Sequence, residues 1–178
     1  MTRIRSHVLR DGDVTVTLLN LGCITQEWRV PLGSERIPVV LGYRDPQAYL
    51  HNQNYLGVIA GRVANRIGGA AFSLQGQCYA LNRNHGAHHL HGGAGGIQTR
   101  IWDMEPEGHK AVQFRLISEH GDQGYPGQAE LIVTVSLSGH VLTYDMRAVP
   151  DRATPINLAQ HWAKCRWRFC WNKAERGP

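Results

Sequence analysis

Short runs of alternating apolar and polar residues recur through most of this 178-residue chain and limit its possible folds more than any other feature. An alternation with a period of two is typical of β-strands that bury one face. Each run is bounded by Gly, Asn, Asp or Pro, and the clearest runs cover residues 14–19, 23–30, 112–118 and 131–137. We therefore predict a mainly β protein.

Two turn-forming pairs, Gln75-Gly76 and Ser138-Gly139, each separate two such runs. They predict β-hairpins, so neighbouring strands should pair antiparallel. A short helix is indicated only at residues 46–51. These features predict an antiparallel β-sandwich in which residues 1–161 form one domain and residues 162–178 form an atypical basic tail rich in Trp and Cys.

The net charge of +5 is concentrated in that tail, which holds five Lys or Arg residues against one Glu. No other stretch combines clustered basic residues with aromatic ones, so we expect no nucleic-acid partner. No stretch approaches the length of apolar sequence that spans a membrane, and the N-terminal residues contain no apolar signal core. We expect a cytoplasmic protein without membrane association, and the sequence leaves its oligomeric state open.

The four cysteines form no closely spaced pairs, so a disulfide framework is not expected. Cys23 and Cys78 lie in strand-like runs, where cysteine commonly packs as a small apolar residue. The other two, Cys165 and Cys170, belong to the tail.

Four histidines lie close together in the segment NRNHGAHHLHGG: His85, His88, His89 and His91. On a strand, His89 and His91 would project from one face and line a cleft, with Leu90 turned to the core. Imidazole also suits zinc, copper or nickel, but a stable site needs three or four convergent ligands and consecutive histidines point apart on a strand. We expect no metal, and a His-rich metal-binding β domain remains an alternative.

Two further segments place polar residues within apolar surroundings. In GRVANRI, Arg62, Asn65 and Arg66 could either tie loop carbonyls together or recognise ligand hydroxyl groups. In TPINLAQHW, Ile156 and Leu158 are expected to point inward, and Asn157 and His161 are the polar members. From the residues alone, the pattern favours a surface or structural role for His161 over an acid–base role.

These segments, with LHGG and GYPG between them, resemble the aldose 1-epimerase or galactose mutarotase family in content and order over most of residues 1–161. The resemblance implies a large antiparallel β-sandwich of the galactose mutarotase-like type with an open sugar-binding cleft. It also implies interconversion of the α and β anomers of a hexose such as galactose or glucose, with no metal or organic cofactor. The hexose is then the expected small-molecule partner.

The resemblance also implies roles for individual residues. His161 corresponds to the general acid that protonates the pyranose ring oxygen, and His91 corresponds to a second histidine of the cleft. Asn65 and Arg66 match positions that contact or orient the sugar, and the Arg66 guanidinium can donate to several oxygens at once. Ring opening needs an acid and a base acting together, and each contributes roughly 100-fold to 10,000-fold.

The sequence departs from the family pattern in its last part. The family's general base is a glutamate well downstream of the acid histidine, and no equivalent occurs here. We expect a truncated sandwich, incomplete at its C-terminus and produced by a frameshift or premature termination. The alternative function is a catalytically defective sugar-binding fragment. His88 and Ile97 also replace the usual Asn and aromatic residue, which we expect to alter sugar preference.

Overall fold

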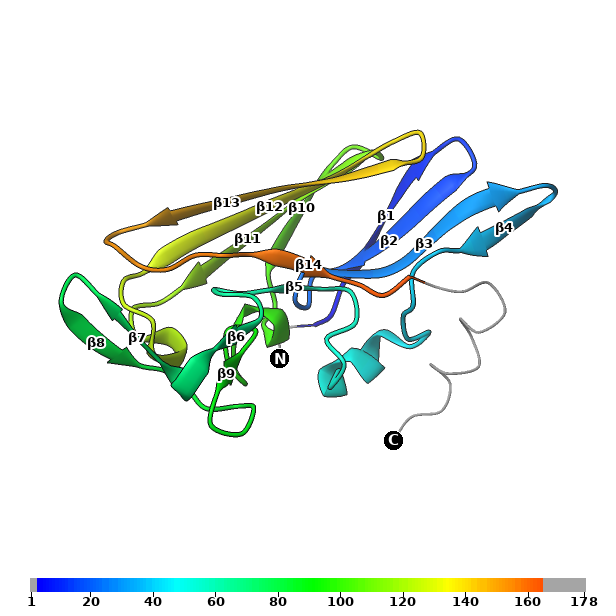
Figure 1. Cartoon of the computed structure of the whole chain (residues 1–178). Coiled ribbons are helices and arrows are strands. Elements are labelled where there is room, and N and C mark those ends of the chain that lie inside the picture. Colours follow the sequence, from blue (N-terminus) through cyan, green and yellow to red (C-terminus); the bar gives the residue numbers. More distant parts are fainter. Residues whose placement is uncertain (1–2, 165–178) are drawn as a thin grey trace.

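The computed structural model describes residues 3–164, which form two four-stranded antiparallel sheets and several shorter elements (Figure 1). In each sheet the strands pair in sequence order. The first sheet contains β1 (Ser6–Asp11), β2 (Val14–Leu19), β3 (Ile24–Leu32) and β4 (Glu35–Pro38). The second contains β10 (Asp103–Glu107), β11 (Ala111–Ser118), β12 (Ala129–Ser138) and β13 (Val141–Pro150).

The two sheets share one hydrophobic core. Alternate residues of β2, β11 and β12 are buried, as in Leu131, Val133 and Val135 of β12. They pack with Val14 and Val16 of β2, so the inward-facing rows of the two sheets meet. The residues that alternate with them, such as Ile132 and Thr134, are only partly buried. This arrangement is an antiparallel β-sandwich, which confirms the fold class predicted from the alternating runs.

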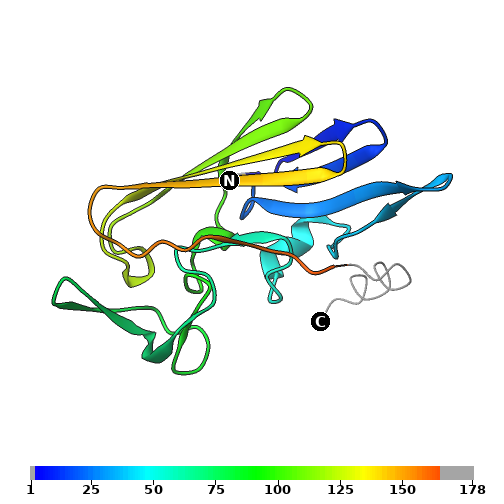
Figure 2. The same cartoon turned by 45° about the horizontal axis from the view of Figure 1, so that its top comes forward.

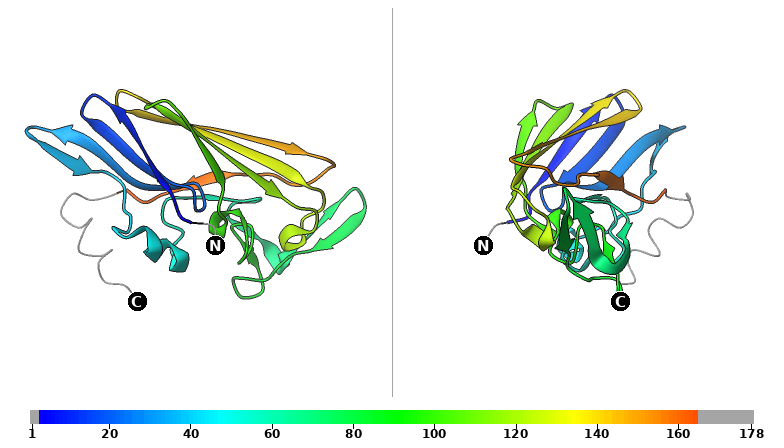
Figure 3. Two further views of the ribbon diagram at one scale, coloured as in Figure 1. Left: turned by 180° about the vertical axis from the view of Figure 1, so that it is seen from behind. Right: turned by 60° about the vertical axis from the view of Figure 1, so that its left-hand side comes forward.

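Shorter elements lie together on one side of the two large sheets (Figures 1 and 2). They form three two-stranded sheets and four 3-10 helices. The views from behind and from the side show these elements gathered below the sandwich (Figure 3). The paired strands are β5 (Val58–Ala60) with β14 (Ala159–His161), β6 (Arg66–Ile67) with β9 (His89–Leu90), and β7 (Ala71–Leu74) with β8 (Gln77–Ala80). The helices are η1 (Pro46–His51), η2 (Gly68–Ala70), η3 (Ile97–Thr99) and η4 (Asp122–Gly124).

The local predictions agree closely with these elements. Strands occupy all four predicted runs, and β7 and β8 form a hairpin around Gln75-Gly76. The β12–β13 turn lies one residue later than predicted, because the ladder begins with Ser138 paired to Val141. The helix at residues 46–51 is a 3-10 helix, begun by the Asp45 carboxylate, which accepts a hydrogen bond from the Gln47 N–H.

The two cysteines in strand-like runs differ in environment. Cys23 is buried in the core as predicted, and burial raises the pKa of its thiol. The same prediction is wrong for Cys78, which is exposed. Cys78 belongs to the β7–β8 hairpin, which pairs with no other strand among residues 3–164 and leaves much of its surface in solvent.

The structure describes only the first three residues of the predicted tail, and these contact β3 and the segment that follows β4. The Trp162 ring packs edge-on against Trp28 with 6.4 Å between centroids, and the Ala163 carbonyl accepts a hydrogen bond from the Leu41 N–H. The remaining tail residues, including Cys165 and Cys170, lie outside the described residues. Within residues 3–164, no helix has the length and apolar character needed to cross a bilayer.

Candidate functional site

The pairing of β14 with β5 fixes the position of His161. His161 lies opposite Val58 in this antiparallel pair, and its carbonyl accepts a hydrogen bond of 2.7 Å from the Gly57 N–H. All three residues of β5 are buried, so the strand is a firm support. Ile156 and Leu158 pack against the core as predicted, which anchors the approach to β14.

The hydrogen bond of the His161 ring determines which nitrogen is available for chemistry. Its Nδ1 lies 3.0 Å from the Tyr55 carbonyl oxygen. A carbonyl can only accept, so Nδ1 carries a hydrogen and donates it. In the neutral ring the Nε2 atom therefore carries no hydrogen and can accept a hydrogen bond.

His91 has the opposite arrangement. Its backbone N–H donates to the Asn65 carbonyl at 2.9 Å, while its ring Nδ1 accepts from the Asn65 backbone N–H at 3.0 Å. Because that amide can only donate, Nδ1 carries no hydrogen, and the neutral ring has its proton on Nε2. Both residues adopt positive φ angles, 52° for His91 and 66° for Asn65. This reciprocal pair of hydrogen bonds holds the unusual backbone in place.

The two imidazoles pack against each other and against one tyrosine. The His91 and His161 ring centroids are 4.9 Å apart at an interplanar angle of 75°. The Tyr55 ring lies 4.8 Å from His91 and 6.1 Å from His161. Burial, followed by the nearby charges of His161 and Arg66, lowers the pKa of His91 to about 4. His91 is therefore neutral near pH 7 and presents an Nε2–H donor.

Asn65 and Arg66 lie beside this pair and are exposed. The Arg66 guanidinium donates to the Asn65 Oδ1 at 3.4 Å, and its other terminal nitrogen lies 3.5 Å from the His85 Nε2. Both contacts are long and leave most of the guanidinium fork facing solvent. The structure thus brings together all four predicted site residues, His91, His161, Asn65 and Arg66.

Arg62, which the sequence left between two roles, is a structural residue. Only 2% of its surface is exposed, and burial lowers the pKa of its guanidinium. Its five N–H groups make six hydrogen bonds, four of them to backbone carbonyls, because the three acceptors of Nη2 share its two hydrogens. The acceptors belong to Ser118, Glu119, Pro126, Gly127 and Thr154. Arg62 therefore ties loop carbonyls together, whereas Arg66 of the same motif is available to a ligand.

The prediction that His89 and His91 line one side of a cleft is wrong. His89 is fully buried, where its Nδ1 lies 2.6 Å from the Asn82 carbonyl and its Nε2 lies 2.9 Å from the Tyr125 hydroxyl. The strand ends at Leu90, which is buried as predicted, and the positive φ of His91 turns its ring away from the face of His89. Two-residue periodicity does not extend across that turn.

The remaining histidines of the cluster have separate contacts. The His88 Nδ1 accepts from the Gly69 N–H at 3.1 Å, and His85 lies near Arg66. Across residues 3–164, no three His, Cys, Asp or Glu side chains are arranged to hold a metal ion. Likewise, no Asp or Glu side chain in this part of the chain is hydrogen-bonded to the His91 or His161 ring.

Tyr55 is the site residue that sequence reasoning missed. Its ring contacts both histidines and its carbonyl orients His161, although 106 residues separate it from that histidine. Its positive φ of 53° is unusual for an aromatic residue and has no signal in the sequence. Its position shortly before GRVANRI was the only available hint.

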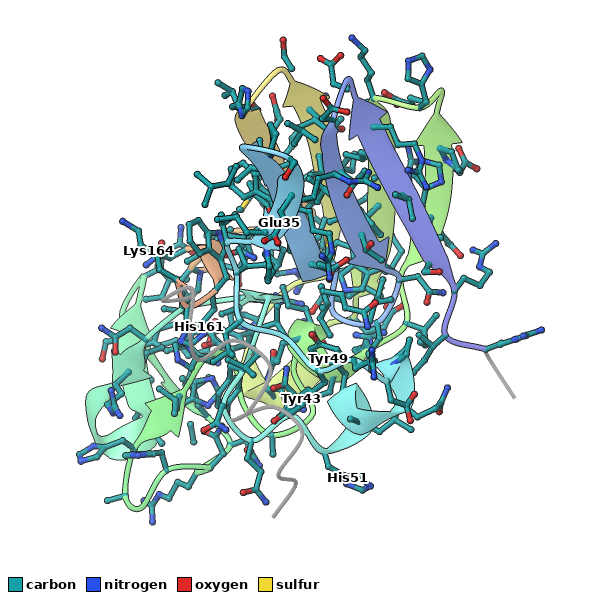
Figure 4. All side chains as sticks on the ribbon, turned by 90° about the vertical axis from the view of Figure 1, so that its right-hand side faces the viewer. Glu35, Tyr43, Tyr49, His51, His161 and Lys164 are labelled. Atoms are coloured by element: carbon teal, nitrogen blue, oxygen red, sulfur yellow. The ribbon has the colours of Figure 1, made fainter. Side chains whose placement is uncertain are left out.

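A separate groove of about 330 Å³ lies between β3 and the segment that follows β4. Its lining residues include Gln26, Arg29 and Tyr43, and it contains neither site histidine. The side-chain view labels His161 and Lys164 on one segment, with Tyr43 and Tyr49 on another (Figure 4). The histidine pair is therefore distinct from this groove.

The fold and the site together define a class of protein, an antiparallel β-sandwich that places two imidazoles and an Asn-Arg pair on short strands beside it. A family model described as aldose 1-epimerase matches residues 5–163. The chain belongs to the aldose 1-epimerase family.

Individual relatives agree with this assignment. The chain is 35% identical over 159 residues to galactose mutarotase of Bos taurus, and 36% identical over 160 residues to galactose mutarotase of Homo sapiens. Each match covers 89% of this chain, but only 46% and 45% of those relatives. A solved structure of a GalM/aldose epimerase homologue from C. elegans superposes with a TM-score of 0.87 at 26% identity, covering 92% of this chain and 51% of that one. The chain thus spans about half the length of the curated relatives it matches.

Proposed function

We propose that this site contributes to the interconversion of the α and β anomers of a hexose, such as galactose or glucose. The observation that carries the proposal is the pair of adjacent imidazoles with opposite tautomers. His161 holds its Nδ1–H on the Tyr55 carbonyl and leaves Nε2 to exchange protons, whereas His91 presents a neutral Nε2–H. One ring is thus suited to acid catalysis and the other to donating a hydrogen bond.

In the proposed reaction, protonated His161 donates its Nε2 proton to the ring oxygen of the pyranose. The bond between that oxygen and the anomeric carbon breaks, while a base takes the proton of the anomeric hydroxyl, and an open-chain aldehyde forms. Rotation about the bond next to the aldehyde carbon, followed by the reverse steps, closes the ring as the other anomer. No covalent bond to the protein forms, and His161 ends in its starting protonation state.

The other residues position the sugar in this proposal. The His91 Nε2–H donates to a sugar oxygen and stays neutral, so that it does not compete with His161 for a proton. The exposed Arg66 fork and the Asn65 amide bind further hydroxyl groups. In the family resemblance the base is a glutamate, and no carboxylate within residues 3–164 is hydrogen-bonded to the two rings.

Polarimetry on freshly dissolved α-galactose or α-glucose tests the proposal. The full chain should speed relaxation to the anomeric equilibrium, and His161→Gln should reduce that acceleration at least about 100-fold, the lower range for loss of a general acid. His51→Gln is the matched control, because His51 is exposed on η1 and forms none of the site contacts. Relaxation at the uncatalysed rate, or an acceleration that His161→Gln leaves intact, would refute the proposed role.

A further inference from the structure

The outer edge of β13 is unprotected. β13 lies at the end of its sheet, is ten residues long, and pairs only with β12 among the residues that the structure describes. The other sheet edges have features that hinder pairing with a further strand, such as proline, charged side chains, short length or a covering segment. β10 contains Pro106 and three carboxylates, β4 has four residues, and the Arg10 N–H of β1 is bonded to the His109 carbonyl. The single proline of β13, Pro150, is its last residue.

The direction of the backbone groups along this edge follows from the ladder. Ser138 and Val141 flank a two-residue turn, so the Val141 N–H faces β12. The Asp151 N–H also bonds across to the Gln128 carbonyl at 2.9 Å, so odd-numbered residues face β12 at both ends. Because the direction alternates along an antiparallel strand, the even-numbered residues from 142 to 148 direct their N–H and C=O groups outward. This edge offers a regular row of unpaired donors and acceptors.

The side chains of β13 form two different rows. Leu142, Tyr144 and Met146 face inward and pack, only partly buried, against the core. Asp145 and Arg147 are exposed in the outer row. Neither of these charged side chains forms an ion pair or a hydrogen bond with another side chain in the range 3–164.

We propose that β13 pairs antiparallel with β13 of a second copy of this chain, about a two-fold axis at Met146. In this register Asp145 lies opposite Arg147 of the second copy, and the symmetry creates that contact twice. Main-chain hydrogen bonds between the two copies require even-numbered residues to lie opposite even-numbered residues. The pairing can therefore slide only by two residues at a time, and each such slide moves the two-fold axis by one residue. With the axis at Asp145 the two Asp145 side chains face each other, and with the axis at Arg147 the two Arg147 side chains do so, which is repulsive in both cases. With the axis at Tyr144, neither Asp145 nor Arg147 faces a charged residue. The charges therefore select one register.

The same register suits the remaining residues. Thr143 lies opposite Val149 of the second copy, which pairs two β-branched side chains and covers part of a valine that is 46% exposed. The half-buried inner rows of the two copies become neighbours and shield each other from water. The two four-stranded sheets then join into one continuous sheet of eight strands through main-chain hydrogen bonds.

Sedimentation or light scattering of the full chain over a range of concentrations tests this pairing. We expect a concentration-dependent dimer. Either Asp145→Arg or Arg147→Asp replaces two attractive contacts with two repulsive ones, which should weaken dimerisation about tenfold or more. Asp13→Arg is the control, because Asp13 is exposed in the β1–β2 turn and the substitution makes the same change in charge as Asp145→Arg.

Charge exchange makes the test specific for the register. An equimolar mixture of Asp145→Arg and Arg147→Asp chains should recover dimers, because each mixed pair again places opposite charges together. The double variant Asp145→Arg/Arg147→Asp should also recover them. A chain that is monomeric at all concentrations, a dimer as insensitive to the single substitutions as to Asp13→Arg, or single variants that mixing fails to restore would each overturn the proposal.

Discussion

Replacing Arg62 with methionine should be among the most destabilising single changes in this chain. Methionine approximates the length of the side chain but removes its six hydrogen bonds. At about 1 kcal/mol of net stabilisation each, these bonds contribute about 6 kcal/mol to the free energy of unfolding. Some of the released loop carbonyls regain water, so we expect a loss of about 3–5 kcal/mol, which is the range for breaking a buried polar network.

Urea denaturation followed by tryptophan fluorescence measures this loss. Arg83→Met serves as the control, because Arg83 is exposed and should change the free energy of unfolding by less than about 0.5 kcal/mol. Arg62→Lys should recover only part of the difference, since an ammonium group has three donors and lacks the planar fork. A loss below about 1 kcal/mol for Arg62→Met would show that these carbonyls find other partners and that the reasoning is wrong.

Three other predictions concern the site and its support. His91 binds a proton less readily in the folded state, so stability should fall as the pH drops from about 6.5 towards about 4, and urea midpoints should show a smaller fall for His91→Gln. Gly92→Ala makes a Cβ atom clash with the Gly61 carbonyl oxygen at a φ of 85°, and should cost at least about 2 kcal/mol in thermal or urea unfolding. Tyr125→Phe leaves the buried His89 Nε2 without its partner and should cost about 1–3 kcal/mol in urea, whereas Tyr79→Phe, at an exposed hydroxyl, should cost little.

The sequence predicts the sandwich well where local pattern and burial coincide. β2 lies where its alternation predicts, because every second residue faces the shared core. Weakly patterned strands escape such reasoning: β1 is mostly polar, and β4 and β10 carry several charges because they lie at sheet edges. Their pairing is decided by the neighbouring strand, which no local window contains.

The site shows the same division between local and distant determinants. The motifs identify His91, His161, Asn65 and Arg66, but the arrangement of the rings depends on backbone contacts between distant segments. Residue type alone could not show that the His91 Nδ1 accepts a hydrogen bond from a backbone amide, whereas the His161 Nδ1 donates one to a backbone carbonyl. The error over His89 arose in the same way, because a single residue of positive φ reversed the expected direction of a side chain.

The short ladder between β5 and β14 also ties chemistry to the progress of folding. Its two strands lie about a hundred residues apart in the sequence, so their pairing closes a very long loop and lowers the conformational entropy of the chain. Only three paired positions offset this loss. Of the strands described, β14 should be among the last to dock and the first to fray, since its own contacts are few. Each time it detaches, the imidazole at position 161 leaves its neighbour while the large sheets stay intact. The proposed proton transfer should therefore vanish at milder denaturant than the bulk β signal does.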